Sequence, residues 1–171
     1  MRYTSLVLAV LMGVMAVGIG TAQADDMSQC SAVQGTYLVG TIVQGPQFWK
    51  AKQTLHGVSL SHTRLTIMVD GKPGTYDVAI DNVFAADYVK ASHTSPVSLM
   101  ALKVGDHLEL CGKAYPAPET GIDWVHTNCG NSPTPNTPDG WVKVIGQDGH
   151  PGVNLESSQQ YCYLWPQQKT H

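Results

Sequence analysis

Alternation of hydrophobic and polar residues is the clearest pattern in this chain, and it predicts β-strands. In residues 61–71, Leu65, Ile67 and Val69 fall on one face and polar residues or Met occupy the other. The turn sequence "DGKPG" follows, and residues 75–83 alternate again. The two segments therefore predict a hairpin with one buried face.

Further strand-like segments are short and are punctuated by Gly or Pro. They are residues 35–45, which Gly40 interrupts, residues 105–115 and 121–129, which flank the turn sequence "PAPETG", and residues 140–149. Residues 84–103 contain Pro96 and predict a short helical or irregular crossover rather than one long helix. No segment shows a sustained amphipathic helix pattern.

Five or six short strands with one irregular insertion predict a mainly β fold. We expect a small barrel of the oligonucleotide/oligosaccharide-binding (OB) type, antiparallel and closed or partly open. An antiparallel β-sandwich is the alternative. Residues 25–171 are enough for one domain with a sizeable core, so we expect a single barrel-like domain there.

Residues 1–24 have the pattern of a secretory signal peptide. Arg2 supplies the positive charge, residues 6–18 are almost wholly apolar, and Ala22-Gln23-Ala24 is a small-x-small cleavage site. The apolar run is short for a membrane span, which needs about 20 apolar residues. The pattern predicts export to the periplasm or the extracellular space, with no membrane span in the mature chain.

The charge of the mature chain argues against nucleic acid as a partner. Without Arg2, nine of the ten basic residues remain against thirteen acidic ones. No run of Lys or Arg is present, and binding to phosphate backbones depends on such clusters.

The four cysteines predict two disulfides, because their number is even and the compartment is oxidising. The turn between Cys111 and Cys129 is centred near residue 120, so an antiparallel hairpin would place these two side by side. Cys30 and Cys162 would then tie the two ends of the chain together. A single zinc site is the alternative, but no C-x-x-C pair supports it.

The stretch "GIDWVHTNCG", residues 121–130, is the most interesting for function. If Cys111 lies opposite Cys129, then Trp124 and His126 face away from the cysteine side of the sheet. A bulge near Gly112 would reverse their direction.

Several catalytic and metal-binding patterns find little support. His126 and Cys129 are three residues apart, as zinc ligands can be, but no second pair accompanies them. No G-x-S-x-G sequence and no phosphate-binding P-loop occur, and no cofactor is expected. Asp123 could form a carboxylate pair with Asp81 or Glu109.

Aromatic side chains favour a binding surface instead. The chain has four Trp and seven Tyr but only two Phe, and Trp and Tyr suit partly exposed contact surfaces. The structural interpretation is that the Trp side chains cover the ends of the barrel. The functional interpretation is that they line a groove.

A family resemblance rests on the C-terminal half of the chain. Its motifs are Gly105-Asp106, Gly112 to Tyr115, Trp124-Val125-His126 and Gly140-Trp141, with weaker likeness in residues 62–69 and in "AIDNVF". With these motifs, the chain resembles a domain-of-unknown-function family of small exported bacterial proteins. An OB-like barrel is expected for this family. The family pattern continues with His-Asp-Pro, whereas this chain has Thr127-Asn128-Cys129. The resemblance implies the fold and export but no chemistry.

These observations predict a non-catalytic binding or interaction module. Its candidate ligand-binding residues are His62, Trp124, His126 and Trp141, and its partner is a small molecule, a glycan, a peptide or a protein. The alternative is a small secreted hydrolase or metal-binding protein that uses His62, His126 and Asp123.

Overall fold

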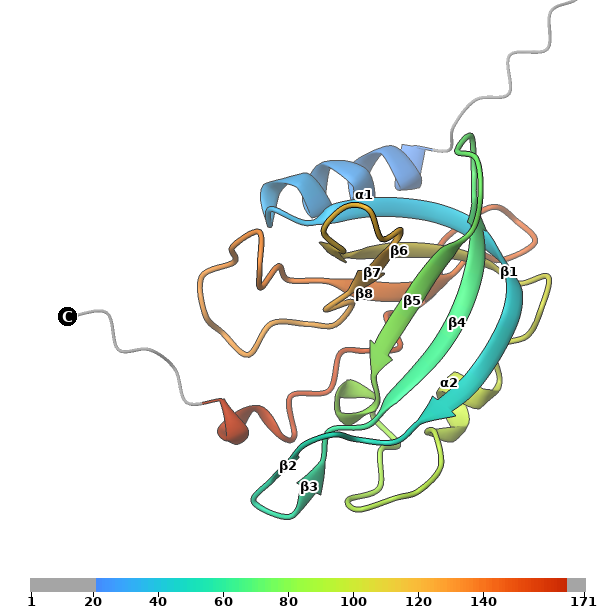
Figure 1. The fold of residues 1–171 in the computed structure, drawn as a ribbon. Coiled ribbons are helices and arrows are strands. Elements are labelled where there is room, and N and C mark those ends of the chain that lie inside the picture. The colour runs from blue at the N-terminus through green and yellow to red at the C-terminus, as the bar shows by residue number, and fades with distance from the viewer. Residues whose placement is uncertain (1–20, 166–171) are drawn as a thin grey trace, which may run out of the picture.

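A closed five-stranded barrel with one additional strand forms the centre of the molecule (Figure 1). The computed structural model describes residues 21–165. The elements are α1 (Thr21–Ala32), β1 (Thr36–Trp49), β2 (Thr54–Leu55), β3 (Val58–Ser59), β4 (His62–Val69), β5 (Tyr76–Asp81), α2 (Val97–Met100), β6 (His107–Ala114), β7 (Gly121–Asp123) and β8 (Trp141–Val144), with 3₁₀ turns at Asn82–Phe84 and Cys162–Leu164. The predicted mainly β, OB-like barrel is confirmed.

The strand order closes the barrel and identifies its topology. Neighbouring strands run β1-β4-β5-β7-β6, and β1 also pairs with β6, while β8 adds to the outer edge of β6. In chain order the five barrel strands are thus arranged 1-2-3-5-4-1, a Greek-key order that suits an OB-type barrel. Only the β5–β7 pair is parallel among the described pairs, so the barrel is mixed rather than wholly antiparallel.

Strand β1 bends because it pairs with a different strand along each half of its length. Its first half pairs with β6 and its second half with β4, where the register shifts twice between Ile42 and Gln47. Gly40 lies so close to β4 that an added Cβ would come 2.5 Å from the carbonyl oxygen of Met68. The predicted bend at Gly40 is therefore matched by a close strand contact, and the strand extends to Trp49, beyond the predicted end at residue 45.

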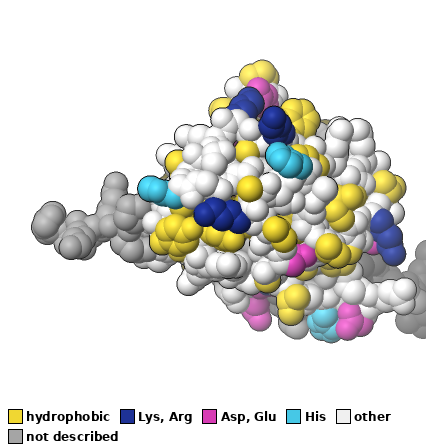
Figure 2. Space-filling model, turned by 90° about the horizontal axis from the view of Figure 1, so that it is seen from below, with side chains coloured by type: hydrophobic (Ala, Val, Ile, Leu, Met, Phe, Trp, Pro, Cys, Tyr) yellow, Lys and Arg dark blue, Asp and Glu magenta, His cyan; other side chains and the backbone are white. Residues whose placement is uncertain are grey.

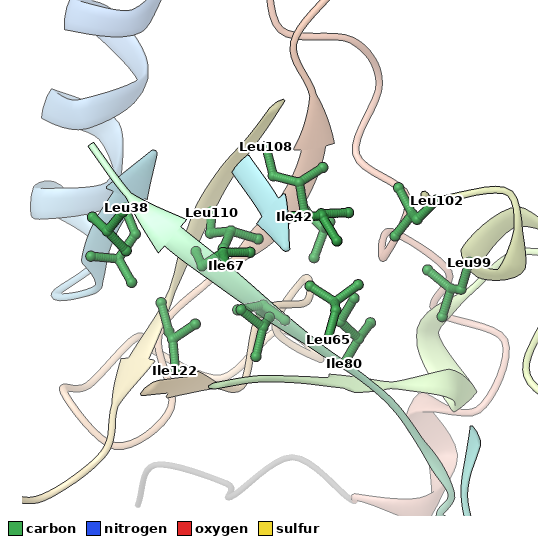
Figure 3. Packing of buried hydrophobic residues seen from close by; sticks show 14 of the residues in the cluster. Leu38, Ile42, Leu65, Ile67, Ile80, Leu99, Leu102, Leu108, Leu110 and Ile122 are labelled. Atoms are coloured by element: carbon green, nitrogen blue, oxygen red, sulfur yellow. The ribbon is translucent and has the colours of Figure 1, made fainter. Parts of the chain in front are cut away.

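The core fills the barrel with aliphatic side chains from each of the five barrel strands and from β8 (Figure 3). Leu65, Ile67 and Val69 are buried, as the alternating pattern predicts. Leu99 and Leu102, from the predicted irregular crossover, enter the same core beside Ile42 and close one end of the barrel. Each such side chain contributes about 1.5–3 kcal/mol by leaving water.

Helix α1 was not predicted, because it lacks an amphipathic stripe. It lies across the end of the barrel opposite the β2–β3 hairpin (Figure 1). A disulfide joins its Cys30 to Cys111 of β6, and Asp26 accepts a 2.8 Å hydrogen bond from Nζ of Lys143 on β8. Residues 21–24 of the predicted signal peptide form its first turn, and the rest of that peptide lies outside the described residues.

The predicted disulfide pairing is wrong, although all four cysteines are bonded. The structure links Cys30 to Cys111 and Cys129 to Cys162. Cys111 lies between β1 and β8 in the sheet, and its sulfur faces α1, so Cys129 has no access to it.

The reason is the true register of the second predicted hairpin. Strands β6 and β7 do pair about the predicted turn, but Lys113 lies opposite Asp123, so the hairpin centre is residue 118 rather than 120. The strand also ends at Asp123, because Trp124 takes a left-handed backbone conformation with φ of 53°. Val125 therefore packs into the core, and the predicted alternation of faces fails beyond Asp123.

Among residues 21–165, no helix has the length and hydrophobicity needed to cross a membrane.

Candidate functional site

A groove of about 1020 Å³ crosses the outer surface of β4 and β5. Its floor includes His62 and Arg64 of β4 and Asp77 and Asp81 of β5, which are the polar positions opposite the core-facing residues. The connection from β1 to β4 forms one wall, and the turn from β6 to β7 forms another. In OB-type barrels this face and these two loops are where oligonucleotides and oligosaccharides bind.

Aromatic side chains from four separate segments line this groove. They are Trp49 at the end of β1, Tyr115 after β6, Trp124 after β7 and Trp165 at the C-terminal end of the described chain. The guanidinium of Arg64 lies 4.4 Å from the centroid of the Trp49 ring, which holds that ring by a cation–π contact. The groove thus offers several flat apolar surfaces between polar groups.

Asp77 interacts with two other residues of the groove. Its Oδ2 accepts a 3.0 Å hydrogen bond from the Tyr115 hydroxyl and lies 3.5 Å from Nη1 of Arg64. Burial, followed by the charge of Asp77, raises the pKa of Tyr115, so this hydroxyl remains a donor. These contacts fix the Tyr115 ring against the groove floor.

Asp81 stands between two histidines. Nε2 of His62 lies 2.8 Å from Oδ1 of Asp81, and this hydrogen bond raises the pKa of His62. Nε2 of His126 lies 3.6 Å from Oδ2, which is longer than a hydrogen bond. The two oxygens of Asp81 are therefore unequal, since one is bonded and the other is not.

The proton of His126 is on the side away from Asp81. Its Nδ1 lies 2.9 Å from the carbonyl oxygen of Thr127, which can only accept, so Nδ1 carries the hydrogen. Its ring stacks on Phe84 with centroids 3.6 Å apart, and burial lowers the pKa of His126. A neutral His126 thus presents a lone pair on Nε2 toward Asp81.

The residues that end β7 carry polar atoms without partners. Oδ1 of Asp123 and Nε1 of Trp124 are buried and have no hydrogen-bond partner among the described residues. Burial raises the pKa of Asp123, and the nearby charge of Asp81 adds to the effect. Gly140 packs closely against this segment and holds the unusual backbone at Trp124. A Cβ added at Gly140 would come 2.6 Å from the Trp124 carbonyl oxygen. Unsatisfied buried groups are costly, so these two atoms are candidates to bond a ligand.

A second cavity, of about 220 Å³, adjoins the groove, and we call it the side cavity. Its lining includes Asp81, Trp124 and Trp165, which also line the groove, together with Phe84 and His126. The Cys129–Cys162 disulfide joins the segment after His126 to the segment that carries Trp165.

The structure brings most of the predicted site residues together. His62, Trp124 and Asp123 line the groove, and His126 lines the side cavity. Trp141 lies elsewhere, buried beneath α1, where its Nε1 donates a 3.0 Å hydrogen bond to Glu109. It lines neither cavity and takes no part in the site that we propose.

Sequence reasoning missed the tryptophans at the two ends of the site as members of it. Trp49 and Trp165 are 116 positions apart, and nothing in a linear pattern indicates that they share a groove. Asp81 was considered only as a possible acid beside Asp123. Its place at the end of a strand, directly opposite His62 in the β4–β5 ladder, was the signal that could have identified it.

The charges around the site do not form a basic surface. Three basic side chains, Lys50, Lys52 and Arg64, line the groove beside four acidic ones. On the face shown in Figure 2, the few basic side chains lie among hydrophobic and uncharged ones. Cys129 is bonded to Cys162, and no group of three or more His, Cys, Asp or Glu in residues 21–165 is arranged to hold a metal ion.

Comparison of the chain with protein-family models, with curated proteins and with solved structures finds no match.

Proposed function

We propose that this protein is an exported, non-catalytic binding module whose groove on β4 and β5 holds an oligosaccharide. The observation that carries the proposal is the convergence of Trp49, Tyr115, Trp124 and Trp165 on one polar groove. The two disulfides are typical of an oxidising compartment, and we propose the periplasm or the extracellular space.

An oligosaccharide suits both kinds of surface in the groove. Aromatic rings contact the apolar C–H faces of sugars, and carboxylates accept hydrogen bonds from sugar hydroxyls. The groove also has the location at which OB-type barrels bind extended ligands. Its balance of three basic and four acidic side chains disfavours a polyphosphate, which requires clustered positive charge.

The test is a titration with cellotetraose and with chitotetraose, followed by tryptophan fluorescence. At least one tetrasaccharide is expected to bind, and Trp49→Ala and Trp124→Ala should each weaken its binding at least tenfold. Trp141→Phe is the matched control, because it removes a tryptophan outside the groove. The proposal fails if neither sugar binds, or if both groove variants bind as tightly as the parent protein.

A second candidate is a small hydrolase that uses His62, His126 and Asp123. The specific observation in its favour is that Asp123 and His62 line the same groove. Burial raises the pKa of Asp123, and the hydrogen bond to Asp81 raises the pKa of His62. A carboxyl with a raised pKa and an imidazole in one groove are groups that general acid–base catalysis can use. Release of shorter sugars from either tetrasaccharide, abolished by Asp123→Asn, would establish this candidate; intact sugars after prolonged incubation would exclude it for these two substrates.

A further inference from the structure

The side cavity contains two hydrogen-bond acceptors that face each other without a proton between them. Oδ2 of Asp81 and Nε2 of His126 are 3.6 Å apart. The proton of His126 is on Nδ1, where the Thr127 carbonyl oxygen accepts it. Asp81 takes its hydrogen bond from His62 through the other oxygen, Oδ1. Among the described residues, no side chain donates a hydrogen bond to both of these acceptors.

Aromatic rings form one part of the wall around these acceptors, and Asn128, Asn131 and Thr137 form another. Phe84 stacks on the His126 ring at 3.6 Å and at 6°, and Trp124 approaches the same ring with centroids 4.8 Å apart. Trp165 stacks on Phe84 at 5.4 Å, so its indole forms part of the same wall. Faces of aromatic rings attract a cation, and the attraction grows when the cation is removed from water.

The charge of the cavity favours the same kind of ligand. Asp81 is its acidic lining residue, and no Lys or Arg is among the residues that line it. An anionic group would meet Asp81 with no Lys or Arg in the cavity lining to compensate its charge. A neutral hydroxyl could donate only one hydrogen bond, whereas a protonated amine has up to three donors and a positive charge.

We propose that the side cavity binds a protonated amine, an alkylammonium group, which donates one hydrogen bond to Oδ2 of Asp81 and another to Nε2 of His126. The indole of Trp165 covers the carbon atoms next to the nitrogen. This inference rests on the proposed function in one respect, since the amine is taken to belong to the ligand whose remaining part lies in the groove. Amine recognition itself depends only on the side cavity.

The test uses small ligands that fill the side cavity alone. The protein is titrated at pH 8 with 2-phenylethylamine, with 2-phenylethanol, which lacks the charge, and with N,N,N-trimethyl-2-phenylethylammonium, which lacks the N–H donors. Binding is followed by isothermal titration calorimetry and by the indole N–H resonance of Trp124. The amine is expected to bind at least tenfold more tightly than either analogue.

Two variants locate the amine within the cavity. Asp81→Asn removes the charge but keeps the size of the side chain, and we expect it to weaken amine binding at least tenfold. Trp165→Leu should weaken amine binding several-fold. It should also weaken 2-phenylethanol binding by a similar factor, whether it is introduced into the parent or into the Asp81→Asn protein. Circular dichroism confirms that each variant is folded.

Each outcome decides the proposal. Equal affinity for the amine and the alcohol, or unchanged amine binding in a folded Asp81→Asn protein, overturns it. Equal affinity for the amine and its trimethyl analogue overturns the role of the two acceptors, even if Asp81→Asn does not fold. Failure of the groove proposal is recognised separately, because it appears as loss of tetrasaccharide binding while the small amine still binds.

Discussion

Two sets of buried polar residues in this molecule each contain a Trp and a Glu, and they differ in how completely they are bonded. In the cluster beneath α1, Glu109 accepts hydrogen bonds from Tyr37 at 2.9 Å and from Trp141 at 3.0 Å. At the groove, the indole nitrogen of Trp124 has no partner in the described structure. Glu156, which lines neither cavity, is fully buried, and neither of its carboxyl oxygens has a partner among the described residues.

Under the proposed function, the difference separates a cluster that maintains the fold from one that serves a ligand. Lys143 reaches both Glu109 and Asp26, so the α1 cluster joins the helix to the barrel through satisfied contacts. Buried polar groups without partners cost stability, and a protein keeps them where another molecule or a proton completes them. On this proposal, hydrogen-bond satisfaction distinguishes the structural polar groups from those that bind a ligand.

The largest effect on stability is expected from removing the Cys30–Cys111 disulfide, which joins α1 to the barrel. Cys30→Ser combined with Cys111→Ser should lower the free energy of unfolding by on the order of 4 kcal/mol, because it frees a long loop in the unfolded chain. Urea denaturation measures the loss. The Cys129→Ser, Cys162→Ser pair is the control, and its smaller closed loop predicts a loss about 1 kcal/mol smaller. The opposite order would contradict the loop-length argument.

The next largest effect concerns the acid at the centre of the α1 cluster. Glu109→Ala should destabilise the protein by about 3 kcal/mol, because the Tyr37 hydroxyl, the Trp141 indole and the Lys143 ammonium all lose an acceptor. Glu109→Gln keeps one acceptor oxygen and should cost less. Chemical denaturation of both variants provides the comparison, and equal losses would show that the charge rather than the hydrogen bonds matters.

The corresponding acid near the groove should behave in the opposite way. Burial raises the pKa of Glu156 well above its usual value, so this carboxyl must take up a proton on folding. With a folded pKa above the unfolded one, stability is highest below the unfolded pKa and falls as pH rises toward the folded pKa. Glu156→Gln removes this penalty and should gain about 2 kcal/mol relative to the parent between pH 4 and pH 6. A gain that does not depend on pH would contradict the assignment; urea denaturation at both pH values decides.

The smallest effect comes from the two indole nitrogens. Trp141→Phe should cost about 1 kcal/mol, because Glu109 loses a donor, whereas Trp124→Phe should change stability by less than about 0.5 kcal/mol. Thermal unfolding measures the stability of the two variants, and the comparison is direct because each variant replaces one Trp by Phe. Similar losses at both positions would remove the distinction between the clusters.

The alternating strands could be predicted from sequence because their faces are set by burial alone. Leu65 and Ile67 face the core, and His62 and Arg64 face the groove, as period-two alternation requires. The region after Asp123 could not be predicted in this way. The left-handed backbone at Trp124 ends the strand, and a ladder argument no longer applies beyond that residue.

Helix α1 and the composition of the site were beyond local patterns for different reasons. The helix is attached by Cys30 and Asp26 rather than by a hydrophobic stripe, so no period of 3.6 marks it. The site needs Trp49 and Trp165, which the barrel closure and the C-terminal segment bring together from opposite ends of the chain. His62, Trp124 and His126 were found because polar or aromatic residues stood out near strand ends.

On the proposed function, the Cys129–Cys162 disulfide would make ligand recognition depend on oxidation of the chain. One of its cysteines follows His126 by three positions, and the other precedes Trp165 by three, so a single bond anchors both sides of the side cavity. Without this bond, the two segments would no longer be tied to each other. The proposed amine site would then acquire its selectivity only after oxidation.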